Sequence, residues 1–335
     1  MKLNPTQKKV FCAINAYPHY NDRQLAEALS MKRSTVTLTR HFLQRHKLYS
    51  LEIFPNYRYL DLALVGMKYG DYGKIKPIDY QQRMKMMTPE VRISECVWSL
   101  SCGFRGFSLF FARDFHPIMA QFHAWDALFR SVDHSILLKD KLFSPLAVKA
   151  FKLLSSQEYL AKVLGINALP QKNHSVEERP LRQNEKKVLL QMVKGANISN
   201  AEISLRSGLS RSLVGRIKNR LVSRGIVQFI NLPAWPLLGV HLAVFFHLRT
   251  SAENKELTAS LQQSPDVIFL LASSYHLLFL ALFKDYEEYQ ASPLVKTIKE
   301  QKDLIIEPVE LMFPLKETIF RIDPSPALKK FFQGP

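Results

Sequence analysis

The chain contains two copies of one sequence module. Leu3–Val10 at its start is matched by Leu181–Val188, and the same offset of 178 residues places Arg33–Val36 on Arg211–Val214 without a gap. A constant offset held over this distance indicates a tandem repeat, and a repeat constrains the fold more strongly than any local pattern. We therefore expect one architecture to occur twice along the chain.

Each copy begins with the pattern of three short helices and a strand. Apolar residues recur at helical spacing, and Gly208 and Gly225 stand where a tight turn and a helix end are expected. Leu48–Tyr59 alternates apolar and polar residues, as the two strands of a wing do, and Ile226–Asn231 begins the equivalent segment. The pattern predicts a winged helix-turn-helix in each copy. The helices of the first copy are expected over 6–16, 23–29 and 33–46. Those of the second are expected over 186–193, from residue 200 onward, and over 211–223.

After each wing, strands and helices follow in the order β-α-β-β-α-β, which is typical of ferredoxin-like domains. The expected fold class is therefore α+β, with two winged helix-turn-helix domains each followed by a ferredoxin-like βαββαβ domain. The predicted elements are 60–69, 78–87, 93–100, 104–111, 117–130 and 135–143 in the first copy, and 238–248, 253–262, 267–272, 276–283, 287–300 and 304–313 in the second.

These patterns divide the chain into six segments. A helix over 145–163 is expected to close the first copy, the polar stretch 165–180 is typical of a linker, and the tail after Pro324 is expected to be peripheral. The predicted division is a winged helix-turn-helix over 1–58, a ferredoxin-like domain over 59–150, a helix and linker over 151–180, a second winged helix-turn-helix over 181–234, a second ferredoxin-like domain over 235–320, and a tail over 321–335.

The composition favours a polyanionic partner and a reducing compartment. A net charge of +17 points to nucleic acid first and to an anionic membrane surface second. Cys12, Cys96 and Cys102 give no disulfide framework, which fits the cytoplasm. The apolar run Val267–Phe283 is shorter than the ~20 residues of a membrane span and has a polar centre, so no membrane-spanning segment is expected.

The second copy resembles the winged helix of Lrp/AsnC-type transcription regulators. The resemblance rests on Ile198–Ile203, Gly208–Ser212 and Arg220–Ile226. It implies a helix-turn-helix followed by a βαββαβ domain that binds a small-molecule effector and pairs subunits, so the expected partners are double-stranded DNA, an effector and a second copy of the chain. The family's Gly–Asp signature has no counterpart here at 103–106 or 274–277, and the tandem arrangement is similar to that of some archaeal regulators.

The residues expected to contact DNA lie on the third helix of each copy. A recognition helix presents its N-terminal side chains to base edges in the major groove, and arginine can bind guanine O6 and N7 or grip phosphate. Two such helices in one chain predict an imperfect inverted repeat, with half-sites one helical turn, ~10 bp, or a multiple apart. The predicted DNA-binding residues are Lys32, Arg33, Ser34, Thr37, Arg40 and His41 in the first copy, and Ser210, Arg211, Ser212, Arg216, Lys218, Asn219 and Arg220 in the second.

No enzymatic activity, metal or cofactor is expected from the sequence. It has no nucleophile triad, P-loop or dinucleotide-binding glycine motif, and His241, His247 and His276 on the second sheet are interpreted as core or interface residues. Two alternatives stay open. Siroheme decarboxylases resemble this architecture, and some of them are fused tandem copies; alternatively, the winged helices bind protein or RNA.

Overall fold

The chain forms two compact units, each built from separate stretches of sequence. The computed structural model describes residues 2–56, 64–71, 96–102, 105–112, 115–132, 139–144, 147–169, 180–196, 198–301 and 303–333. Unit 1 comprises residues 1–54, 150–175 and 228–309, and unit 2 comprises 55–149, 176–227 and 310–335. Each unit therefore contains residues from both sequence copies, and the six-segment division drawn from the sequence stays a prediction.

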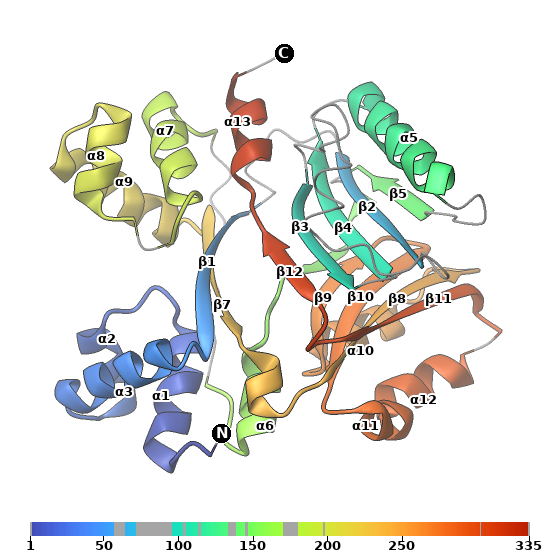
Figure 1. The fold of residues 1–335 in the computed structure, drawn as a ribbon, viewed down its shortest axis with the longest axis horizontal. Coiled ribbons are helices and arrows are strands. Elements are labelled where there is room, and N and C mark those ends of the chain that lie inside the picture. Colours follow the sequence, from blue (N-terminus) through green and yellow to red (C-terminus); the bar gives the residue numbers. More distant parts are fainter. Residues whose placement is uncertain are drawn as a thin grey trace. The chain divides into compact units, whose positions relative to one another are not determined.

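Three short helices open unit 1. They are α1 (Pro5–Ala16), α2 (Asp22–Leu29) and α3 (Arg33–Arg45), the first three helices in Figure 1. Asn4 and Asn21 begin α1 and α2 with capping boxes, in which the side-chain oxygen accepts a backbone N–H of the first turn. Val10, Val36 and Leu43 are fully buried between the helices, as the helical spacing predicts. Helix α6 (Gln157–Leu164) also packs against α1.

The strand after α3 pairs with the equivalent strand of the other copy. β1 (Tyr49–Pro55) and β7 (Val227–Pro233) form a two-stranded sheet. The Asn56 N–H donates to Ile226 O, and the Ala234 N–H donates to Leu48 O, each at 2.8 Å. These two hydrogen bonds are related by the same offset of 178 residues. The expectation that 48–59 holds both strands of one wing is thus corrected: β1 satisfies its backbone groups with β7, and residues 57–63 lie outside the described ones.

The larger sheet of unit 1 confirms the β-α-β-β-α-β order predicted for the second copy. A 3-10 turn over Trp235–Leu238 leads into it. The strands lie in the order β11-β8-β10-β9-β6. Its elements are β8 (Leu242–Thr250), α10 (Lys255–Gln263), β9 (Val267–Ala272), β10 (His276–Phe283), α11 (Tyr286–Ala291), α12 (Pro293–Glu300) and β11 (Ile305–Pro314).

The added edge strand of this sheet comes from the first copy. β6 (Ala150–Lys152) pairs antiparallel with β9. The single helix expected over 145–163 is therefore wrong: a three-residue strand comes first, and α6 follows it. The strand forms because β9 offers an unpaired edge, which local sequence cannot reveal.

The sheet of unit 2 has the matching plan. Its strands lie in the order β12-β3-β4-β2-β5, and α5 (Phe115–Val132) packs on it through Ile118 and Phe122. The helix expected over 78–87 lies outside the described residues. The strands are β2 (Leu64–Asp71), β3 (Cys96–Cys102), β4 (Arg105–Ala112), β5 (Lys139–Phe143) and β12 (Ile319–Ile322).

The C-terminal segment is part of unit 2 and not a peripheral tail. β12 pairs antiparallel with β3 and so completes the sheet of the first copy, as β6 completes that of the second. Helix α13 (Ser325–Gln333) contacts both β3 and α7, and buries Ala327 and Leu328. Burial of these side chains and backbone pairing at the edge of β3 hold the segment in place.

Three helices of the second copy complete unit 2. They are α7 (Gln183–Met192), α8 (Asn200–Ser207) and α9 (Arg211–Ser223), drawn in yellow-green to yellow in Figure 1. Ser199 and Ser210 cap α8 and α9. Gly208 ends α8 with φ of 70°, a left-handed conformation that glycine adopts without a steric penalty.

Among the described residues, no helix is long and apolar enough to cross a membrane.

Candidate functional site

One face of α9 is exposed and carries most of the helix's positive charge. Val214, Ile217 and Leu221 turn the opposite face into the core of the three helices. Among the described residues, neither Arg211 nor Arg216 makes an ion pair, so both guanidinium groups are available to an external anion. The residues of this face that the sequence predicted to contact DNA and that the structure exposes are Ser210, Arg211, Ser212, Arg216, Asn219 and Arg220.

Three predicted residues of the second copy also have partners or cover within the protein. The Ser210 hydroxyl accepts the Leu213 N–H at 3.3 Å and so caps the helix. Arg220 Nη1 lies 3.3 Å from the buried carboxylate of Glu185, which holds one end of its guanidinium. Lys218 is half-buried, and burial lowers the pKa of its ammonium group. Arg211 and Arg216 are therefore the exposed cations of α9 for which the described residues provide no ion-pair partner.

Helix α3 presents a mixed surface. Lys32, Arg33, Ser34 and His41 are exposed on it. By contrast, the predicted residues Thr37 and Arg40 are bound to Asp22 at the start of α2. Their contact with DNA stays a prediction. The Thr37 hydroxyl donates to Asp22 Oδ2 at 2.7 Å, Arg40 Nε lies 2.6 Å from Asp22 Oδ1, and Arg40 Nη2 donates to Tyr20 O at 2.9 Å.

A second group of polar side chains lies on the sheet of unit 1. His247 Nε2 and His276 Nδ1 are 2.9 Å apart, on the adjacent strands β8 and β10. Arg249 is the register partner of His276 and is exposed. Because side chains alternate along a strand, these three residues share one sheet face. The ring contact between Phe283 and Tyr289 places α11 on the other face.

This group has the chemistry of a proton donor beside a cation. When two imidazoles face each other at hydrogen-bond distance, one ring donates and the other accepts, so at most one proton is shared between them. His247 is 2% exposed, whereas His276 is only half-buried and Arg249 is open to solvent. Such a group can bind a carboxylate through the guanidinium and deliver a proton through the imidazole.

Sequence reasoning found the histidines but not their grouping. From the sequence alone, His247 and His276 are each interpreted singly, as core or interface residues. The antiparallel register of β8 with β10 is the signal that joins them and adds Arg249. His241 lies elsewhere, at the exposed position before β8, where its N–H donates to Lys284 O.

Comparison with known proteins identifies the α7–α9 segment. Residues 181–228 match the family of winged helix-turn-helix DNA-binding domains. The prediction of a winged helix-turn-helix in the second copy is therefore confirmed, and the unengaged arginines of α9 lie within the matched residues. No curated protein matches the chain.

Solved structures give a likeness over the full length. The crystal structure of the siroheme decarboxylase NirDL superposes with a TM-score of 0.55 at 12% identity, covering 98% of this chain and 99% of that one. The transcriptional regulator NMB0573 of Neisseria meningitidis, in complex with L-Met, matches 40% of this chain and 89% of its own at 21% identity and a TM-score of 0.34. AsnC of E. coli matches 40% and 93% at 15% identity and a TM-score of 0.32.

The full-length likeness corrects one expectation. The prediction that the chain is not an enzyme is wrong as drawn, because a fold that spans both copies is also the fold of a decarboxylase. Contiguous catalytic motifs are absent from the sequence, whereas the histidine pair of this sheet is formed by residues of separate strands. At 12% identity the likeness shows the fold, and one fold serves many functions.

Proposed function

We propose that this chain is a transcription regulator that binds double-stranded DNA through the exposed face of α9. The observation that carries the proposal is the pair of unengaged arginines, Arg211 and Arg216, on the third helix of a segment that matches a DNA-binding family. A helix of this kind fits the major groove, and each arginine can bind guanine O6 and N7 through two parallel hydrogen bonds. A net charge of +17 adds sequence-independent attraction to phosphate.

In this proposal the first copy supplies a second reading helix. Helix α3 would contact DNA through the exposed Lys32, Arg33, Ser34 and His41, and the target would be an imperfect inverted repeat. The proposal is supported by the identical offset of both helices in the repeat and by the pair of offset-related hydrogen bonds that join β1 and β7. A small-molecule effector and a homodimer formed through the sheet domains are further predictions, and DNA binding would place the chain in the cytoplasm or nucleoid.

A binding measurement tests this proposal. Wild-type chain is used to select duplexes from a random pool, and affinity for the selected duplex is followed by fluorescence anisotropy at several salt concentrations. Replacing Arg211 and Arg216 together with alanine is expected to weaken binding by at least about tenfold, since each base contact is worth ~1–3 kcal/mol. Arg206→Ala is the control, because Arg206 is already paired with Glu202. Equal affinity of the double variant and the control would refute the proposal.

The second candidate function is decarboxylation of siroheme or a related acidic tetrapyrrole. It is favoured by the fold shared with siroheme decarboxylase over the full length and by the His247, His276 and Arg249 group. In such a step a carbon–carboxylate bond breaks, CO2 leaves, and a proton takes its place on the carbon. Arg249 would pair with a substrate carboxylate, and the histidine pair would supply the proton.

Incubation with siroheme separates this candidate from DNA binding. The expected results are a shifted absorption spectrum on mixing and loss of CO2 from the tetrapyrrole by mass spectrometry. His276→Asn and Arg249→Ala should slow product formation, whereas His241→Asn, a histidine outside the group, should not. Unchanged siroheme after prolonged incubation with wild-type chain would exclude this candidate.

A further inference from the structure

The exposed faces of α3 and α9 start alike. The repeat offset places Arg33 on Arg211 and Ser34 on Ser212, and all four side chains are exposed. In a helix that enters the major groove, these first-turn residues lie nearest the DNA. The two helices thus begin with the same pair of polar groups, and any difference in what they read must come from the next turn.

The next turn differs at one exposed position. Leu38 on α3 corresponds to Arg216 on α9. Leu38 is 71% exposed, so α3 holds an apolar side chain in water where α9 holds a cation. One turn further, His41 and Asn219 are both polar and exposed.

The residues before this position reinforce the difference. Thr37, beside Leu38, directs its hydroxyl to Asp22, and Arg40 is bound to the same carboxylate. In the central turn of α3, Leu38 is therefore exposed, whereas the polar groups of Thr37 and Arg40 are bound to Asp22. In α9 the residue before Arg216 is Gly215, which has no side chain, and Arg216 itself is exposed.

We propose that the two helices read different base pairs, with Arg216 specifying a G·C pair and Leu38 specifying an A·T pair. This inference rests on the proposed DNA binding. Arginine donates two hydrogen bonds to guanine O6 and N7, whereas an apolar side chain packs against the thymine C5-methyl group. Leucine over guanine would leave these two acceptors without a donor, and burying unpaired polar groups is unfavourable. The half-sites are therefore unequal at this base pair, although both begin with the same arginine.

Reciprocal substitutions in the full chain test the proposal. Sites are selected from random duplexes by wild-type chain, by Leu38→Arg, by Arg216→Leu and by the double swap. Wild type should select unequal half-sites, Leu38→Arg should replace the A·T preference of one half-site by G·C, and Arg216→Leu should do the reverse in the other. The expected change in discrimination at that base pair is about 5- to 150-fold. The double swap should exchange the two half-sites.

A matched control separates base reading from added charge. Leu205 on α8 is 85% exposed and outside both third helices, so Leu205→Arg adds the same charge without an expected change in the selected base. Both target positions are exposed, and thermal unfolding tests whether each variant is folded. Selected sites that stay the same in all the swapped variants would overturn this inference and leave DNA binding intact. Failure of wild type to enrich any duplex would overturn the proposed function itself.

Discussion

The two copies place charge at different points of the same architecture. In the first copy Asp22 joins α2 to α3 through Thr37 and Arg40, whereas Asn200, Gly215 and Lys218 stand at these positions in the second. There the helices come close instead, and a Cβ built on Gly215 would lie 3.3 Å from Asn200 Nδ2. One helix pair is thus joined by charge-assisted hydrogen bonds and the other by close packing.

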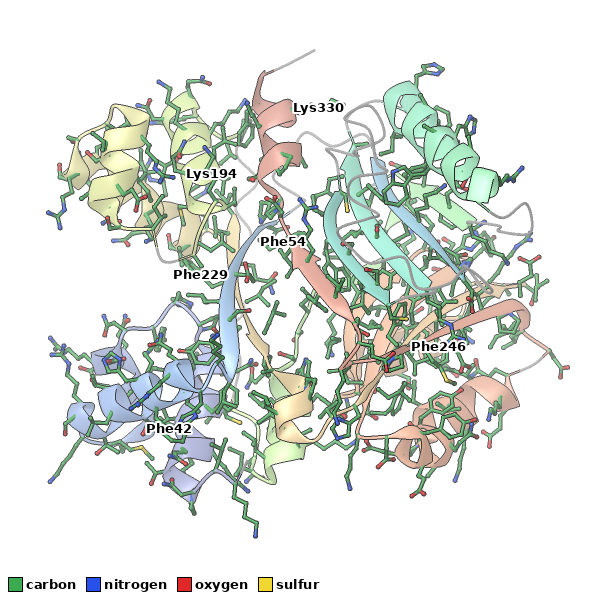
Figure 2. The ribbon with its side chains drawn as sticks, in the orientation of Figure 1. Phe42, Phe54, Lys194, Phe229, Phe246 and Lys330 are labelled. Atoms are coloured by element: carbon green, nitrogen blue, oxygen red, sulfur yellow. The ribbon has the colours of Figure 1, made fainter. Side chains whose placement is uncertain are left out.

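Between the first and third helices, it is the second copy that carries the ion-paired residues. In the second copy Glu185 on α7 faces Arg220 and Arg224, while the first copy has Gln7, Phe42 and His46 at these positions. Phe42, labelled on α3 in Figure 2, contacts the His46 ring with centroids 4.4 Å apart.

The sheets repeat this exchange of charge for packing. In unit 1, Phe246, which is labelled in Figure 2, stacks on Phe279. Their ring centroids are 4.7 Å apart. The repeat offset places Lys68 at the position of Phe246, and in unit 2 it forms an ion pair of 2.9 Å with Asp126 of α5. At these positions the fold therefore requires side chains that fill the available volume and polar groups that have partners. Packed aromatic residues and ion-paired residues both meet this requirement.

The largest expected loss follows removal of Glu185. Its side chain is 2% exposed, accepts the Arg182 N–H at 2.9 Å, and faces Arg224, which is also buried. Glu185→Ala should lower the free energy of unfolding by about 3–5 kcal/mol, because a buried guanidinium loses its counter-charge. Chemical denaturation measures this, with Glu185→Gln, the residue type of the first copy, as the milder control. A Glu185→Gln variant as stable as wild type would show that the ion pairs contribute nothing.

A smaller loss is expected in the sheet of unit 2. Lys68 is 1% exposed at its side chain and Asp126 26%. Asp126→Ala should destabilise the protein by about 2–3 kcal/mol because the buried ammonium is left unpaired, while Lys68→Met should cost less than about 1 kcal/mol. Thermal and urea unfolding of both variants show whether position 68 needs a charged side chain or only one of similar volume. A greater loss for Lys68→Met than for Asp126→Ala would contradict the comparison between the sheets.

The α2–α3 link of the first copy should be worth less, because it is partly open to solvent. Side-chain exposure is 20% for Arg40 and 21% for Asp22. Asp22→Ala is expected to cost about 1–2 kcal/mol through loss of hydrogen bonds to a charged group. Arg23→Ala breaks the well-exposed pair with Glu27 and should cost less than about 0.5 kcal/mol. Similar effects of the two substitutions, measured by urea unfolding, would argue against a structural role for Asp22.

The smallest effect is expected when the link of the first copy is introduced into the second. Asn200→Asp gives Lys218 a carboxylate at the position of Asp22 and adds a negative charge to the first turn of α8. The gain in stability should not exceed about 1 kcal/mol. The same change should raise the lowered pKa of Lys218 toward its ordinary value, which NMR titration of the lysine side chain measures. An unchanged pKa of Lys218 would show that the two groups do not meet.

Sequence patterns predicted the elements that depend on local periodicity. The first three helices of each copy and the β-α-β-β-α-β order of the second follow from apolar spacing, capping residues and glycines such as Gly208. By contrast, the pairing of β1 with β7 and the edge strands β6 and β12 depend on partners far away in sequence. β6 has only three residues, too few for a period to show.

The candidate sites divide in the same way. The exposed positions of α9 could be read from helical spacing. The engagement of Thr37 and Arg40 by Asp22 needed the packing of α2 on α3, and the grouping of His247, His276 and Arg249 needed the strand register.

The alternation of the chain between the units, five passages in all, has a genetic consequence. A gene cut between the copies would encode two polypeptides, neither of which holds all the residues of either unit. Such fragments should be able to rebuild the molecule only when mixed. The two copies are therefore inherited as one, and a mutation can alter the third helix of one copy while the third helix of the other stays unchanged.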